Sequence, residues 1–95
     1  MFMRAVHLTV RGQVQGVGFR WFVREAARRA GLAGWVRNLP DGSVELKAAG
    51  SDQGVAYLLT VVRRGPERAR VDEVSEVALD TDAGLAKPFT VLKGQ

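Results

Sequence analysis

The strongest constraint on the fold of this chain is the order in which two hydrophobic periods alternate along it. Val6, Leu8 and Val10 alternate with polar residues, which is the period-two pattern of a strand with one buried face. From Phe19 to Ala30 the apolar residues recur at the spacing of an amphipathic helix, and Gly31 is predicted to end that helix. A strand therefore leads through a glycine-rich turn directly into a helix.

The middle of the chain predicts a hairpin followed by a second helix. Trp35 to Leu39 and Ser43 to Ala48 are predicted to pair, because the Pro-Asp-Gly sequence between them is typical of a tight turn. The second helix is predicted to begin after a cap at Ser51 or Asp52 and to end before Gly65. Its apolar stripe consists of Val55, Leu58, Leu59 and Val62.

The last third of the chain predicts two further strands. Val71 to Leu79 is predicted to be a strand with either a bulge or an irregular entry, because its valines break strict alternation, and Phe89 to Leu92 adds a short final strand. The order β-α-β-β-α-β is typical of the α+β ferredoxin-like sandwich, with an antiparallel sheet and both helices on one of its faces. A chain of 95 residues has room for one domain, which we expect to span 1–95.

The composition excludes several classes of protein. The chain has no cysteine, so disulfide frameworks, thiolate metal sites and cysteine nucleophiles are excluded, and we expect a reducing cytoplasm. It has no apolar run near the ~18 residues that a membrane span needs, and we expect no membrane partner. The formal net charge of +4 favours anionic partners, although the many arginines can also reflect a general bias of the source genome.

The segment from Gly12 to Arg20 carries the clearest sign of chemistry. Gly12, Gly16 and Gly18 stand between a strand and a helix, where backbone N–H groups can converge on an anion that the helix N-terminus also attracts. The alternative is a tight turn that needs glycine for positive φ. Arg20 lies in the first turn of the helix, where the positive end of the helix dipole makes a cation unfavourable by roughly 0.3 to 1 kcal/mol. A bound phosphate would compensate for this, so we favour it over an arginine that extends into solvent.

Asn38 is the second candidate, at the end of the first hairpin strand. Its amide can either hold a water molecule or bond to the backbone of the adjacent turn, and the residue pattern leaves both open. His7 alternates with core residues and is predicted to lie on the open sheet face rather than in a site. The acidic residues show no spacing typical of a metal cage, so we expect no metal; these are Asp41, Glu45, Asp72, Glu73 and Glu76.

Three segments together resemble the acylphosphatase family. Gly12 to Arg20 reads GQVQGVGFR, and Gly31 to Asn38 with Asp41 to Glu45 reads GLAGWVRN and DGSVE, similar to the two signatures of that family. Gly65 to Val71 is similar to a further family segment, G-P-x-x-A-x-V, so the resemblance covers nearly the whole chain.

The resemblance implies a ferredoxin-like fold and hydrolysis of the carboxyl-phosphate bond of small acyl phosphates by in-line water attack, without a metal or cofactor. It implies that Arg20 and the loop residues Gln15, Gly16, Val17, Gly18 and Phe19 bind the phosphoryl group, and that Asn38 positions the water. We then expect inorganic phosphate and sulfate to compete with the substrate, and we expect a monomer. Many family members have threonine where this chain has Val23.

Two other functional classes are compatible with a ferredoxin-like fold. A ferredoxin-like RNA-binding module stacks bases on aromatic residues of the open sheet face. We predict no aromatic there and expect no nucleic acid as a partner, because Trp35 and Phe22 are predicted to be core residues and only Trp21 is predicted to be exposed. A non-catalytic phosphate-binding domain is the third class. The predicted open-face positions are His7, Thr9, Arg11, Ser43, Glu45 and Lys47.

Overall fold

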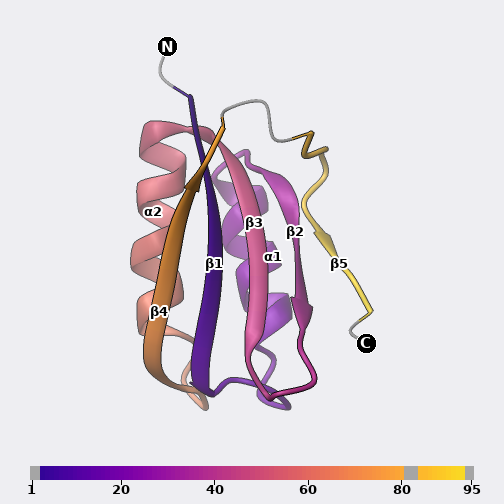
Figure 1. Cartoon of the computed structure of the whole chain (residues 1–95), viewed down its shortest axis with the longest axis vertical. Coiled ribbons are helices and arrows are strands. Elements are labelled where there is room, and N and C mark those ends of the chain that lie inside the picture. Colours follow the sequence, from indigo (N-terminus) through magenta and orange to yellow (C-terminus); the bar gives the residue numbers. More distant parts are fainter. Residues whose placement is uncertain (1–2, 81–83, 94–95) are drawn as a thin grey trace.

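The computed structural model describes residues 3–80 and 84–93, which form one sheet with two helices (Figure 1). The elements follow one another as predicted, including the short final strand. Their bounds are β1 Met3–Gln13, α1 Phe19–Arg29, β2 Ala33–Asn38, β3 Val44–Ser51, α2 Asp52–Arg64, β4 Arg70–Leu79 and β5 Thr90–Val91.

The strands lie side by side in the order β4-β1-β3-β2-β5. Strand β1 pairs antiparallel with both β3 and β4, and β2 pairs antiparallel with β3, as the ferredoxin-like prediction requires. Strand β5 runs parallel to β2, so the complete sheet is mixed and the antiparallel prediction holds for its first four strands. The final strand is also shorter than predicted, because Phe89 turns into the core and is fully buried.

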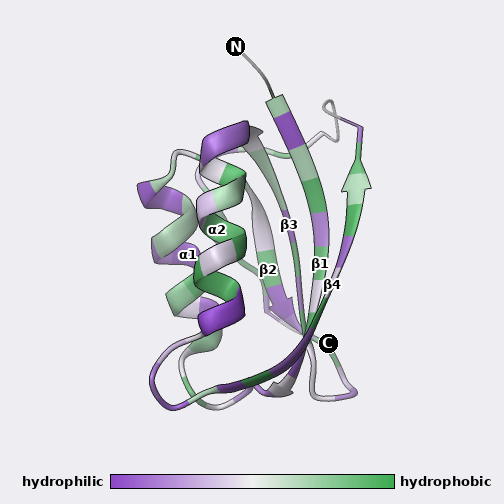
Figure 2. Cartoon of the chain, turned by 90° about the vertical axis from the view of Figure 1, so that its left-hand side faces the viewer, coloured by the Kyte–Doolittle hydropathy of each residue, from purple (hydrophilic) through white to green (hydrophobic). Residues whose placement is uncertain are grey.

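Both helices cover the same face of the sheet, which confirms the predicted arrangement of layers (Figure 2). The predicted stripes of the helices are the buried ones, because each contributes the apolar residues that recur at the helical period. The sheet meets them with alternate residues of β1 and β3. The buried side chains include Val6, Leu8 and Val10 from β1, Val23, Ala26 and Ala27 from α1, and Val55, Leu58 and Val62 from α2.

Two predicted local features are confirmed. Ser51 caps α2, because its Oγ accepts a hydrogen bond of 3.0 Å from the backbone N–H of Gly54. The pairing of β1 with β4 shifts between Arg11 and Gly12, which face Glu73 and Val71, so Asp72 is the extra residue of a bulge.

The predicted core position of Trp35 is wrong. Its neighbour Val36 is fully buried, so the period of two turns Trp35 to the open face of the sheet, beside Lys47 of β3. The guanidinium carbon of Arg37 lies 5.2 Å from the centre of the Trp35 ring, and the Lys47 Nζ lies 5.9 Å from it. The open face therefore carries one aromatic residue between two cations. Phe22, also predicted to be a core residue, is only half-buried, with its ring centre 6.2 Å from that of Phe19, and Trp21 is exposed as predicted.

Glu45 holds the centre of the open face together. Its carboxylate accepts a hydrogen bond of 2.7 Å from the Arg37 Nε and lies 2.7 Å from the His7 Nε2. Partial burial acts to raise the pKa of Glu45, but the hydrogen bonds from Arg37 and His7 outweigh it and hold the pKa below its usual value. Ser43, which was predicted to lie on this face, is buried instead.

Candidate active site

The glycine-rich turn of the sequence is a loop between β1 and α1 that offers unpaired backbone donors. Gly16 and Gly18 have φ angles of 74° and 77°, in the left-handed region that favours glycine. No atom lies within 4 Å of where a Cβ would stand on either glycine, so packing does not require them. Among the described residues, no backbone hydrogen bond outside the helices and strands starts from an N–H between 15 and 20.

The first turn of α1 adds its own free donors and no compensating acid. Gly18 stands at the N-cap position without a side-chain cap, and the first turn contains no acidic residue. The positive end of the helix dipole therefore faces the same space as the loop N–H groups, which is the arrangement that binds anions.

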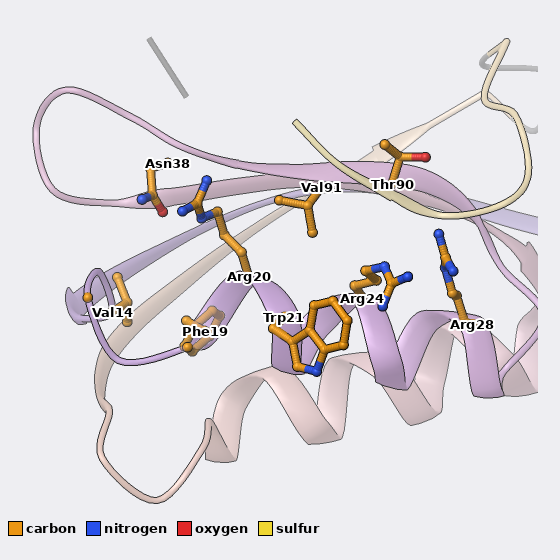
Figure 3. Close-up of a pocket in the computed structure, with 11 residues that line it drawn as sticks. Val14, Phe19, Arg20, Trp21, Arg24, Arg28, Asn38, Thr90 and Val91 are labelled. Atoms are coloured by element: carbon orange, nitrogen blue, oxygen red, sulfur yellow. The ribbon is translucent and has the colours of Figure 1, made fainter. Parts of the chain in front are cut away.

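Arg20 points into this space rather than into solvent. Its side chain is half-buried, its Nη1 lies 3.5 Å from the backbone oxygen of Leu92, and its guanidinium extends toward Asn38 (Figure 3). No carboxylate of the described residues forms a salt bridge with Arg20. The cation at the helix N-terminus is therefore available to an anion from outside the chain.

Asn38 lies at the end of β2, beside Arg20, with a buried and unpartnered acceptor. Its Oδ1 is inaccessible to solvent and has no hydrogen-bond partner in the described part of the chain. The adjacent turn is closed instead by Asp41, whose carboxylate accepts hydrogen bonds from the N–H and the hydroxyl of Ser43. Those two bonds hold the pKa of Asp41 below its usual value. The turn does not use Asn38, so its amide is free for a ligand.

Gln15 fixes the distance between the loop and Asn38. Its Nε2 donates to the backbone oxygens of Leu39 and Ser43, at 2.8 and 2.9 Å, and so ties the loop to the hairpin that carries Asn38. The Gln15 side chain is thereby committed, and only its backbone N–H remains for a ligand. Phe19 is likewise committed to the core, where its side chain is buried.

These groups line one end of a groove of about 530 Å³ (Figure 3). Gly16, Gly18, Phe19, Arg20 and Asn38, all predicted site residues, lie at that end, whereas Gln15 and Val17 contribute no side-chain wall. The groove continues along α1 and under β5, and sequence reasoning missed this part. The missed residues along this part are Trp21, Arg24, Arg28, Thr90 and Val91, and Val14 was missed at the loop end.

A signal for part of the missed wall was present in the sequence. Arg24 and Arg28 follow Arg20 at intervals of four residues, which places all three on one face of the helix. No comparable signal marks Thr90 and Val91, because β5 reaches the groove only through its pairing with β2.

The described residues contain no cluster of three side chains suited to hold a metal ion. Neither described helix is long and apolar enough to cross a membrane.

Comparison with known proteins identifies the family. A family model described as Acylphosphatase matches residues 6–91. The chain belongs to the acylphosphatase family. The family hydrolyses acyl phosphates, and the chain is a hydrolase of this class.

Individual relatives agree over nearly the whole chain. The acylphosphatase of Oceanobacillus iheyensis is 49% identical over 83 residues, which cover 84% of this chain and 91% of the relative. The acylphosphatase of Methylococcus capsulatus is 49% identical over 96 residues, which cover 96% of this chain and 98% of the relative. The crystal structure of acylphosphatase from Bacillus subtilis superposes with a TM-score of 0.88 at 33% identity, covering 96% and 99%. The recognised family and the ferredoxin-like fold are thus confirmed.

Val23, where many acylphosphatases have threonine, is fully buried in the core between α1 and the sheet. It does not line the groove.

Proposed function

We propose that the chain hydrolyses small acyl phosphates in the groove, with the phosphoryl group bound by the backbone N–H groups of Gln15 to Phe19 and by Arg20. The loop donors and the helix dipole would stabilise the charge on the equatorial phosphoryl oxygens, where a loose transition state keeps it. Arg20 would add a bidentate contact to the same oxygens.

In this proposal Asn38 holds the attacking water in line with the departing carboxylate. The observation that carries the proposal is the buried Asn38 Oδ1, which has no partner among the described residues and lies at the same end of the groove as Arg20. Because this oxygen is closed to solvent in the structure, the Asn38 side chain would have to turn it toward the groove, which Asn38 lines, for a water to donate to it. A buried polar atom without a hydrogen-bond partner destabilises the folded protein by roughly 1 to 3 kcal/mol. A bound water would therefore also stabilise the protein.

The leaving group needs no general acid. The conjugate acid of a carboxylate has a pKa near the ~4 of Asp and Glu, so it departs at neutral pH as an anion. Apart from arginines, whose guanidinium groups stay protonated, the described residues that line the groove include no titratable side chain. We propose that the reaction runs without a metal ion or a cofactor.

Hydrolysis of benzoyl phosphate in the presence and absence of excess EDTA tests this mechanism. We expect the same rate under both conditions, and almost no turnover of an alkyl phosphate monoester, whose alkoxide leaves poorly without an acid or a metal. Strict dependence on Mg²⁺, or comparable turnover of the two ester types, would contradict the proposal.

We further propose that the protein acts in the cytoplasm as a monomer of one domain, 1–95, and that inorganic phosphate or sulfate competes at the loop. The absence of cysteine supports the location. Nucleic acid is not a proposed partner. Trp35 does lie on the open face, but the anionic Glu45 beside it would repel a phosphate backbone.

A further inference from the structure

The groove is longer than the phosphoryl site at its end. Its volume of about 530 Å³ lies within the usual range of ~300 to 1,000 Å³ for pockets that take drug-sized ligands, whereas one phosphoryl group occupies only the loop end. The remaining length runs along α1, away from Asn38 (Figure 3). Something attached to the phosphoryl group can therefore lie there.

The walls of this remaining length carry two cations. Arg20, Arg24 and Arg28 lie one above the next on α1, at about 6 Å of helix length per interval. Like charges four residues apart destabilise a helix by about 0.2 to 0.5 kcal/mol for each pair, so the row opposes helix stability. All three line the groove.

Arg24 and Arg28 are each held in place by a neighbour. The guanidinium carbon of Arg24 lies 4.2 Å from the centre of the Trp21 ring, and its Nη1 forms an ion pair with Glu25 at 2.5 Å, so a substrate anion would share Arg24 with that carboxylate. Glu25 lines the neighbouring groove between α1 and α2, not this one. The Arg28 Nε donates to the backbone oxygen of Phe89 at 2.9 Å, and its other guanidinium N–H groups have no hydrogen-bond partner within residues 3–80 and 84–93.

The direction of the proposed reaction points the substrate's acyl part toward these arginines. In an in-line displacement the water and the leaving group occupy opposite sides of the phosphorus. With the water at Asn38, the departing carboxylate faces the Arg24 end of the groove, which Figure 3 shows on the far side of Arg20.

We propose that Arg24 and Arg28 are specificity-determining residues, which select acyl phosphates whose acyl part carries a second anionic group. This inference rests on the proposed function. Such substrates share a second anionic group, most simply a carboxylate, which would lie farther along α1 than the acyl carbon. Bidentate and charge-assisted hydrogen bonds to arginine would recognise it.

Two rigid substrates of the same shape test the inference. One is 4-carboxybenzoyl phosphate, and the other is 4-carbamoylbenzoyl phosphate, which replaces the carboxylate by a neutral amide. We expect kcat/KM to be at least about tenfold higher for the carboxylate, after both are corrected for their uncatalysed hydrolysis. Measurement at 0.15 M ionic strength limits the contribution of distant charges.

Substitutions locate the origin of the preference. Arg24→Gln and Arg28→Gln should each lower the ratio of the two kcat/KM values, and the double variant should bring it to about one. The matched control is Arg29→Gln, which removes the same charge from the same helix but from a residue that lines the other groove. Thermal melting of each variant shows whether it remains folded, and Arg24→Gln suffices if loss of the Arg28 bond to Phe89 unfolds the protein.

Each outcome bears on one of the two proposals. A ratio near one in the unaltered protein, with benzoyl phosphate still hydrolysed, would overturn this inference and leave the proposed function intact. A ratio that falls equally in Arg29→Gln, or that persists in the double variant, would also overturn it. Failure to hydrolyse any of the three acyl phosphates would instead overturn the proposed function and the inference with it.

Discussion

Asn38 and Asp41 lie in the same hairpin, but their side chains have different surroundings. Asp41 closes the turn through its two hydrogen bonds with Ser43, whereas the Asn38 Oδ1 has no partner in the described residues. The two residues therefore allow a structural role and a chemical role to be separated within one short segment.

We expect Asn38→Ala to lower kcat for benzoyl phosphate about 10² to 10³-fold, because a single preorganised polar group of this kind typically contributes that much. The inhibition constant for inorganic phosphate should change by no more than a few fold, since the loop and Arg20 remain. Steady-state kinetics with phosphate as inhibitor gives both values.

Asp41→Ala is the matched control for that substitution. It removes the hydrogen bonds of the turn and should lower the free energy of unfolding and the Tm, while kcat stays within a few fold. If Asn38→Ala behaved in the same way as Asp41→Ala, the proposed role of Asn38 would be wrong.

At the scale of the elements, the close approach of β2 and β3 depends on one glycine. A Cβ on Gly34, whose φ is 137°, would stand 1.9 Å from the backbone oxygen of Lys47. Gly31 also has a positive φ, of 71°, but no atom lies within 4 Å of its Cβ position. Both glycines therefore have a positive φ, but only at Gly34 would a Cβ also clash with neighbouring atoms.

We expect Gly34→Ala to lower the free energy of unfolding by roughly 2 to 5 kcal/mol, because backbone strain of ~1 to 2 kcal/mol adds to a clash of ~1 to 3 kcal/mol. Gly31→Ala should lower it by the strain alone, about 1 to 2 kcal/mol. Urea denaturation of both variants measures the difference. Equal losses would show that β2 and β3 can separate to admit the methyl group.

The sequence predicts the elements better than it predicts which residues surround the groove. Helix stripes and the cap at Ser51 follow from local spacing, and so does the bulge at Asp72. The predicted core position of Trp35 is wrong, although its alternation with the buried Val36 already pointed outward. The parallel pairing of β5 with β2 joins residues far apart in the chain, and no local pattern marks such a pairing.

The residues of the candidate site also fall into those that the sequence predicts and those that depend on tertiary contacts. The loop and Arg20 could be predicted because a strand, glycines and a cation at a helix start are neighbours in sequence. The alternatives for Asn38 could not be decided, because that needed the knowledge that Asp41 closes the turn. Likewise the anchoring of Gln15 on the hairpin depends on tertiary contacts.

At the scale of the whole molecule, an anion that binds only to the folded state should stabilise it. Phosphate at a hundredfold excess over its Kd adds roughly 2.7 kcal/mol to the free energy of unfolding. For a chain of this length that corresponds to a rise in Tm of about 10 to 20 °C. Thermal melting with and without phosphate measures the rise.

Arg20→Ala should abolish most of this rise, while Arg29→Ala, a matched loss of charge from the same helix, should retain it. Without phosphate, Arg20→Ala should melt no lower than the unaltered protein, because it removes a cation from the positive end of α1. An unchanged phosphate-induced rise in Arg20→Ala would show that the glycine-rich loop is only a structural turn.

The wall that β5 adds to the groove has a consequence for biosynthesis. The loop and Arg20 are translated before Asn38, and Thr90, Val91 and the Leu92 carbonyl beside Arg20 leave the ribosome about 50 residues after Asn38. Both edges of strand β1 are paired only after β4 has also been synthesised. A nascent chain can therefore present the anion-binding loop while one side of the substrate groove is still missing, and substrate selection begins only after synthesis has passed β5.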